Sequence, residues 1–388
     1  MHISKHTKSI MIPLVAAVAL AFSTAVTAAD DLIVKIGHVG PISGPSAHLG
    51  KDNENGAKMA IEELNAKGIM FGSKKVKFEL QTEDDGGDPK QGTAVAQKLV
   101  DAKVAGVVGH LNSSTSIPAA KIYHDAGIPQ ISPASTATAY TAMGYKSTFR
   151  VVANDGQLGG TLGRYAVQTL NAKTIAVIDD RTAYGQGVAD EFIKGAKSKN
   201  PAIKMVQRQF TNDKATDFNA ILTSIKAAKP DVVFFGGMDS VGGPMLRQMK
   251  SLGITAKFMG GDGICTAKLP DLAGDALGNE QVICAEAGGV IDAQKKANDD
   301  FRAAYKKRFN AEVLLYSPYV YDSVMTLADA MQQAKSADPT VYLPFLQNIH
   351  HKGITGDIVF DKKGDIKDGT LTMYTYKAGK RSEMGVVK

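Results

Sequence analysis

From residue 32 onward, short apolar runs alternate with longer stretches in which apolar residues recur every three or four positions. The short runs are rich in Val and Ile and predict β-strands at 32–39, 76–81, 104–108 and 128–131. The longer stretches predict helices with one buried face at 53–66, 90–101 and 116–125. Strands that are apolar on both faces and alternate with helices indicate a parallel sheet covered by helices.

The same alternation then restarts. It predicts helices at 156–170, 186–198, 217–228 and 241–252, and strands at 174–178, 203–210 and 232–235. Because the pattern occurs twice, we expect two α/β domains. The last part of the chain differs and predicts helices at 293–309, 318–335 and 341–350, with short strands near 358–360 and 371–376. We expect these late elements to return and complete the two sheets.

The N-terminal residues have the pattern of a secretory signal. Lys5 and Lys8 precede an apolar run over 10–22, and small residues follow over 26–29. This order predicts a signal peptide over residues 1–28, with cleavage after Ala28. The apolar run is short for a transmembrane helix, and an uncleaved anchor is the alternative interpretation. No cysteine follows the leader, so a lipid anchor is not indicated.

Composition narrows the class of protein. Of 388 residues, 44% are hydrophobic and 22% are charged, which is ordinary for a globular protein and excludes general disorder. The length suits two domains. The formal net charge is +6, and two of the positive charges, Lys5 and Lys8, belong to the leader. A charge this weak and dispersed does not indicate a nucleic-acid partner.

The chain has two cysteines, Cys265 and Cys284. Export to an oxidising compartment permits disulfides. We therefore favour a disulfide between these two residues. The alternative is a pair of buried free thiols, because unpaired cysteine is often a small core residue.

Motifs of exported enzymes are missing. The sequence has no G-x-S-x-G, and Gly185-Gln186-Gly187 is followed by Asp190 where a dinucleotide-binding loop needs its third glycine. No H-E-x-x-H occurs, and the eight histidines show no metal-ligand spacing. Adjacent His350 and His351 are interpreted as a solvated helix end. We expect no catalytic residue, metal or cofactor, and an exported α/β hydrolase remains the weaker alternative.

Polar loops follow several predicted strands at their carboxyl ends, where open parallel sheets bind ligands. The loop 109–116 carries hydroxyl residues at all four positions 113–116 and leads into a helix. Hydroxyl and backbone N–H groups at a helix N-terminus suit a carboxylate, although an N-cap would need only one hydroxyl. The other loops are 132–136, 179–187, 235–239 and 260–263. In the last, Asp262 lies between glycines and could meet an ammonium group, or could be an ordinary turn residue.

Taken in order, these segments resemble the Leu/Ile/Val-binding proteins of bacterial amino-acid ABC importers. The matching motifs are Gly40-Pro41-Ile42-Ser43-Gly44-Pro45, Asp84-Asp85 with Asp88-Pro89-Lys90-Gln91, Gly109-His110-Leu111, Tyr184-Gly185, Gly236-Gly237, Leu272-Ala273-Gly274, and Phe360-Asp361 with Lys363-Gly364-Asp365. The resemblance implies a type I periplasmic-binding fold, with two Rossmann-like α/β lobes whose parallel sheets are flanked by helices. A three-crossing hinge would join residues 30–153 plus 286–368 to residues 154–285 plus 369–388.

The resemblance also implies a set of ligand-binding residues. Ser113 and Thr136 would bind the α-carboxylate of an amino acid, with Leu111, Asn112 and Ala134 in the same two loops. Asp262 would bind the α-ammonium group, which Thr136 and the Ala134 carbonyl would share. The family's tyrosine from the second lobe corresponds to Tyr184. The side-chain pocket would be lined by Leu49, Met238 and Tyr316.

Three of these positions depart from the family pattern. Asp262 replaces the commoner Glu and is one methylene shorter. Leu49 and Met238 replace aromatic residues, which leaves a more adaptable wall for an aliphatic side chain. The family's occasional disulfide would join the positions of Gly87 and Asn112, where this chain has no cysteine.

The resemblance therefore implies a periplasmic, monomeric receptor that binds branched-chain amino acids and delivers them to a membrane permease. It implies neither an enzyme nor a nucleic-acid partner. A receptor of the same fold for another small carboxylate, such as an aromatic acid, keto acid or amide, is the main alternative. The carboxylate of Asp262 favours a ligand with a cationic amine. The leader and the lack of a helix-turn-helix argue against a sugar-responsive transcription factor of the same fold.

Overall fold

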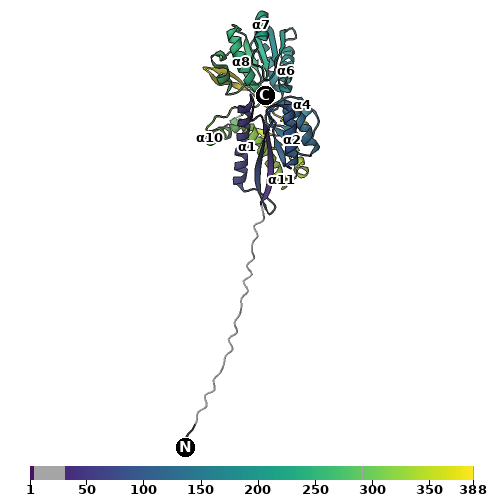
Figure 1. The fold of residues 1–388 in the computed structure, drawn as a ribbon, viewed down its shortest axis with the longest axis vertical. Helices are drawn as coiled ribbons and strands as arrows, with labels where there is room; N and C mark the ends of the chain where they lie inside the picture. The colour runs from purple at the N-terminus through teal and green to yellow at the C-terminus, as the bar shows by residue number, and fades with distance from the viewer. Residues whose placement is uncertain (4–30, 291, 388) are drawn as a thin grey trace.

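The computed structural model describes residues 1–3, 31–290 and 292–387. The predicted signal peptide therefore lies, apart from its first three residues, outside the described residues. Two α/β lobes lie one above the other along the longest axis (Figure 1). Helices α1, α2 and α11 belong to the lower lobe in this view, and α6, α7 and α8 belong to the upper one.

The first lobe is built on a six-stranded sheet of order β2-β3-β1-β4-β5-β6. Its strands are β1 (Leu32–Gly40), β2 (Met70–Phe71), β3 (Lys74–Asp84), β4 (Gly106–Val108), β5 (Gln130–Ser132) and β6 (Thr148–Arg150). All neighbours are parallel except β2 and β3, which form a short hairpin. The carboxyl ends of β1, β4 and β5 therefore meet at one edge, as the strand-helix alternation predicts.

Helices cover both faces of this sheet. They are α1 (Ala47–Lys67), α2 (Pro89–Asp101), α3 (Ser113–Asp125), α4 (Ala139–Ala142), α10 (Asp292–Phe309), α11 (Ser317–Ala334) and α12 (Pro339–Gln347). Local sequence explains where α2 begins, because the Asp88 side chain accepts hydrogen bonds from the backbone N–H groups of Lys90 and Gln91. Pro89 occupies the first helical position, where its missing N–H costs nothing.

The second lobe is built on a seven-stranded sheet of order β15-β14-β11-β10-β9-β7-β8. Its strands are β7 (Thr174–Asp179), β8 (Lys204–Phe210), β9 (Val232–Gly236), β10 (Lys257–Gly260), β11 (Val282–Glu286), β14 (Leu371–Lys377) and β15 (Lys380–Val387). Helices α5 (Asp155–Gln168), α6 (Ala183–Lys199), α7 (Asn219–Ala228), α8 (Asp239–Ser251) and α9 (Leu269–Ala273) flank it, with short 3₁₀ turns η1 (Asp262–Ile264) and η2 (Gly274–Leu277). The strands β7 to β11 are parallel, whereas β14 and β15 add an antiparallel edge.

The chain passes between the lobes at several points. It leaves the first sheet after β6 and enters the second at β7; α10 and α11 return to pack on α1, and the chain joins the second sheet again at β14. One apolar cluster runs through these connections and joins the cores of both lobes. The residues at which one lobe passes into the other remain a prediction.

The sequence analysis missed or misplaced several elements. The sequence does not predict strands β2, β6, β10, β11, β12 (His351–Lys352) and β15 or the short helices α4 and α9, and α1 begins at Ala47 rather than at 53. The early turns of α1 carry the polar residues Asp52, Asn53 and Glu54, which are buried, so the apolar period does not mark them as helix. The predicted strand at 358–360 is the two-residue β13 (Asp357–Ile358), which pairs with β12 in a separate ladder. The expectation that the late elements complete both sheets is therefore wrong for the first sheet, since β14 and β15 join only the second.

The interpretation of His350 and His351 as a helix end is wrong. Helix α12 ends at Gln347, and His351 begins β12. The ring of His351 lies 2.9 Å from the carboxylate of Asp329, and that of His350 lies 3.2 Å from Asp357. Among the described helices, none combines the length and the apolar character needed to cross a bilayer.

Candidate ligand-binding site

A cavity between the lobes collects most of the residues that the sequence singled out. Eight of them line it: Leu111, Asn112, Ser113, Ala134, Tyr184, Met238, Asp262 and Tyr316. The other two, Leu49 and Thr136, are buried but are not among the lining residues. The lining comes from the carboxyl ends of strands in both lobes, as expected for open parallel sheets.

The first wall of the cavity is the N-terminus of α3. This helix starts at Ser113, five residues after β4 ends, so its first backbone N–H groups have no partner within the helix. The hydroxyl of Ser113 accepts a hydrogen bond of 3.2 Å from the backbone N–H of Ala137. Together, these N–H groups and the positive end of the helix dipole favour an anionic group in the cavity.

The two polar loops of the first lobe are joined beneath this wall. The carbonyl oxygen of His110 accepts hydrogen bonds from Ser116 at 3.1 Å and from Ser132 at 2.9 Å. The fully buried His110 ring lies 2.8 Å from Asp85 and 3.1 Å from the hydroxyl of Tyr123. This network fixes the loop that leads into α3. Asp85 and His110 occur in two separate sequence motifs, and nothing in those motifs predicts that the two side chains meet.

The opposite wall carries Asp262, the first residue of η1 directly beyond β10. Its side chain is only 1% exposed, and one of its oxygens accepts a 2.8 Å hydrogen bond from the hydroxyl of Tyr316. Burial raises the pKa of Asp262 to about 6, although the hydrogen bond from Tyr316 acts in the opposite direction. A cationic group in the cavity would stabilise the ionised form of this carboxyl.

Glycines allow Tyr184 to approach Asp262. The backbone N–H of Gly263 donates a 3.0 Å hydrogen bond to the hydroxyl of Tyr184. A Cβ atom on Gly261 would lie 2.6 Å from that hydroxyl, and a Cβ atom on Gly263 would lie 2.9 Å from the tyrosine ring. A larger residue at either position would therefore push Tyr184 out of place.

Tyr316 is held by a residue that the sequence analysis did not single out. Asp52, buried in α1, accepts hydrogen bonds from the backbone N–H groups of Tyr316 at 3.0 Å and of Ser317 at 3.1 Å. These bonds also satisfy free N–H groups at the start of α11. Asp52 therefore positions the residue that contacts Asp262. In the sequence, Asp52 is a polar residue just before the predicted helix at 53–66, and nothing else there indicates that it positions Tyr316.

A second buried acid lies beside the cleft. The backbone N–H of Asp155 donates a 2.8 Å hydrogen bond to the carbonyl of Thr136. Burial raises the pKa of Asp155 well above its usual range, and the nearby charge of Asp262 raises it further. Asp155 follows no strand that the sequence predicts, so its position along the chain gives no signal that it lies beside the cleft.

The remaining part of the cavity is where a ligand's side chain would fit. Met238 occupies the N-cap position of α8 and lines the cavity together with Pro45, Gly86 and Gly87 of the first lobe. Leu49, by contrast, is completely buried in the core of the first lobe. Its predicted role in the side-chain pocket stays a prediction.

The lobes touch each other around the cavity. The backbone N–H of Ala183 donates a 3.0 Å hydrogen bond to the hydroxyl of Ser114, and Tyr316 reaches Asp262 as described. The ring of His48 in α1 lies 2.9 Å from the carboxylate of Asp239 at the start of α8. These contacts close the cleft around the site.

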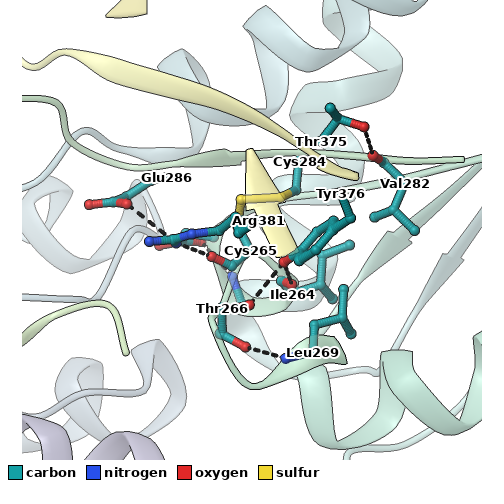
Figure 2. The surroundings of a disulfide bond; sticks show 12 residues. Ile264, Cys265, Thr266, Leu269, Val282, Cys284, Glu286, Thr375, Tyr376 and Arg381 are labelled. Atoms are coloured by element: carbon teal, nitrogen blue, oxygen red, sulfur yellow. Dashed lines mark hydrogen bonds and ion pairs between the residues drawn. A yellow bond between two sulfur atoms is a disulfide. The ribbon is translucent and has the colours of Figure 1, made fainter. Parts of the chain in front are cut away.

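The predicted disulfide between Cys265 and Cys284 is present, so the alternative of two free thiols is wrong. It links the loop that follows Asp262 to β11 (Figure 2). The hydroxyl of Tyr376 also lies 2.9 Å from the carbonyl oxygen of Thr266 in this loop. The loop that follows Asp262 is thus fixed to two neighbouring strands of the second sheet, β11 and β14. Within the described residues, no group of His, Cys, Asp or Glu side chains is arranged to hold a metal ion.

Comparison with known proteins agrees with this architecture. Residues 33–381 match the family model described as "Periplasmic binding protein". A Leu/Ile/Val-binding protein homolog of Brucella abortus is 37% identical over 90% of this chain and 91% of its own. The leucine-, isoleucine-, valine-, threonine- and alanine-binding protein of Pseudomonas aeruginosa is 35% identical over 96% of this chain and 97% of its own.

A solved structure shows the same fold. The branched-chain amino acid transporter substrate-binding protein of Streptococcus pneumoniae, in complex with isoleucine, superimposes with a TM-score of 0.80 at 25% identity. The match covers 91% of this chain and 98% of that one. With matches of this extent, and with two α/β lobes around one inter-lobe cavity, the chain belongs to the periplasmic binding protein family.

Proposed function

We propose that this protein is a periplasmic receptor that binds an aliphatic, branched-chain α-amino acid between its lobes and delivers it to the permease of an ABC importer. The observation that carries the proposal is the placement of two opposite recognition elements around one cavity. The N-terminus of α3 with Ser113 lies on one side, and the buried carboxyl of Asp262 lies on the other.

Zwitterion recognition requires both elements. A buried charge without a partner is costly, so a ligand carboxylate and a ligand ammonium group each need a complementary group. In this proposal Ser113, Thr136 and the N–H groups at the start of α3 bind the carboxylate. Asp262 and Tyr184 bind the ammonium group. Since these groups belong to different lobes, the bound ligand bridges the lobes and favours their closure.

The aliphatic class of side chain is supported by the pocket and by the relatives. Met238 and Pro45 offer apolar contact, and the two curated relatives carry names that include leucine, isoleucine and valine. The structural relative was solved with isoleucine. We propose that the protein works as a monomer after cleavage of its leader at Ala28. N-terminal sequencing of protein from the periplasm would then begin at Ala29.

Calorimetry tests the function directly. The protein is unfolded to release any ligand acquired during expression, refolded, and titrated with the twenty amino acids and with the keto acids of Leu, Ile and Val. We expect the tightest binding for a branched-chain amino acid and much weaker binding for its keto acid. Tighter binding of a keto acid, aromatic acid or amide would instead identify a receptor for another small carboxylate.

A further inference from the structure

We propose that the contact between His48 and Asp239 is an inter-lobe latch that stabilises the closed form and slows ligand release. The inference rests on the proposed function, since it concerns the closure that follows ligand binding. The two residues are 191 positions apart and belong to different lobes, His48 to α1 and Asp239 to α8.

The imidazole ring of His48 in the first lobe contacts the carboxylate of Asp239 in the second lobe. The Nε2 atom of His48 lies 2.9 Å from Oδ2 and 3.1 Å from Oδ1 of Asp239. The carboxylate of Asp239 is completely buried, whereas the His48 side chain is 20% exposed. Separation of the lobes would remove this partner from Asp239 and admit water in its place.

Asp239 is fixed within the second lobe even without His48. Its Oδ2 atom accepts a 2.6 Å hydrogen bond from the hydroxyl of Thr266. It is also the first residue of α8, where the positive end of the helix dipole favours a carboxylate. The acceptor therefore does not need to reorganise when the lobes close. A preorganised acceptor loses little conformational entropy on forming the contact.

The latch is connected to the ligand site on two sides. Met238, the residue before Asp239, lines the cavity. Thr266 follows Cys265 in the loop that begins with Asp262, and the disulfide fixes that loop to β11. Neither His48 nor Asp239 lines the cavity. Two other polar contacts between the lobes involve Ser114 and Tyr316, which do line it. His48 can therefore be altered without touching the ligand.

This arrangement predicts a specific kinetic effect. A contact made only in the closed form adds to the free energy that the ligand must overcome to leave, and it does not act on the first encounter. Loss of a buried hydrogen bond to a charged group changes the equilibrium constant of the contact by about tenfold or more. Since His48 is partly exposed, we expect its loss to raise the dissociation rate about fivefold, with the association rate changed less than twofold.

The first arm of the test compares variants by stopped-flow release of the amino acid that binds most tightly in calorimetry. His48→Ala should release it about fivefold faster than the wild type, and His48→Gln, which keeps an N–H donor, should recover part of the difference. His350→Ala is the matched control, because it removes a histidine that contacts Asp357 within the first lobe at 3.2 Å. That control should leave both rates unchanged.

The second arm measures closure itself. Spin labels at Lys121→Cys in α3 and Lys226→Cys in α7, both exposed, report the inter-lobe distance by pulsed electron paramagnetic resonance. His48→Ala should lower the closed fraction both without ligand and at a fixed, sub-saturating ligand concentration. In the background of Asp239→Asn, His48→Ala should have a clearly smaller effect, because its partner is already altered.

Dissociation of His48→Ala within twofold of the wild type, an equal effect of His350→Ala, or full additivity with Asp239→Asn would each overturn the latch. Failure of the proposed function has a different signature, since the wild type itself would then bind no amino acid. In that case the closed fraction of the ligand-free wild type and His48→Ala still decides whether the contact favours closure.

Discussion

The hydroxyl of Tyr316 donates a hydrogen bond of 2.8 Å to Oδ2 of Asp262 and thereby joins the two lobes inside the cavity. Tyr316 immediately precedes α11 in the first lobe, and Asp262 begins η1 in the second. The tyrosine is a neutral partner for a buried acid whose pKa burial raises to about 6. A ligand ammonium group would be a stronger, charged partner, and this difference favours an amino acid over a ligand without the amine.

The first prediction concerns recognition of the amine. We expect Asp262→Asn to weaken binding of the preferred amino acid by at least about 1.5 kcal/mol, because a charge-assisted hydrogen bond is lost. Binding of the matching keto acid should suffer less. Calorimetry of both ligands with wild type and variant measures the difference, and equal losses for the two ligands would remove the ammonium role of Asp262.

The second prediction is a pH dependence of affinity. Because burial raises the pKa of Asp262 to about 6, the ligand-free protein gains a proton on this carboxyl as the pH falls below that value. A cationic ligand prefers the carboxylate, so amino-acid affinity should fall by up to about tenfold per pH unit below about 6 and should level off above about 7.

Calorimetric titrations between pH 5 and 8 measure this profile. The keto acid, which lacks the amine, should bind no more weakly at pH 5 than at pH 8. Asp262→Asn should flatten the profile of the amino acid. A flat profile for the amino acid with wild-type protein would show that the charge of Asp262 does not contribute.

The third prediction concerns the disulfide. Cys265 and Cys284 are 19 positions apart, and the chain-entropy model gives about 3 kcal/mol for closing a loop of this size. Cys265→Ser combined with Cys284→Ser should therefore lower the free energy of unfolding by about that amount. Denaturant titration measures it, with reduced wild-type protein as the comparison.

The bond itself is checked by mass spectrometry of protein from the periplasm. Without reduction, no thiol should react with an alkylating agent under denaturing conditions. Two alkylated cysteines would contradict a disulfide in the exported protein. Since the bridge fixes the loop that carries Asp262, the double variant should also bind the amino acid more weakly than the wild type does.

The fourth prediction is that Met238 contributes to side-chain selectivity. It lines the cavity. The residues proposed to bind the α-carboxylate and the α-ammonium group recognise parts that all amino acids share, so they do not select a side chain. One methylene is worth only about 1–3 kcal/mol in an apolar pocket, so a ranked preference among Leu, Ile and Val is expected. Met238→Tyr should reorder that ranking, because a ring replaces a flexible thioether side chain. An unchanged ranking by calorimetry would show that Met238 does not select the side chain.

The strand and helix order was largely predictable, because each element leaves its own period in the sequence. The carboxyl-end rule for parallel strands also directed attention to the loop at 109–116, which lines the cavity. The pairing of Cys265 with Cys284 followed from the predicted leader and from the count of two cysteines. Each of these inferences depends on neighbours along the chain or on composition.

Other features depended on the packing of distant segments. Asp52 and Asn53 interrupt the apolar pattern of α1 because they are buried polar residues, and the carboxylate of Asp52 satisfies N–H groups of α11 some 260 residues away. No local period marks such a residue. The strands β10 and β11 are also not marked by a local period, because they have only four and five residues.

The sequence by itself determined the α/β class, the doubled architecture and the disulfide pair, because periodicity and composition are read along the chain. Its resemblance to the Leu/Ile/Val-binding proteins implied most of the residues that line the cavity. Only the tertiary structure decided that Tyr316 meets Asp262, that His48 meets Asp239 and that Asp52 meets the start of α11. The physical reason is that hydrophobic periodicity specifies which face of an element is buried, whereas the partner of that face is set by how the two lobes pack.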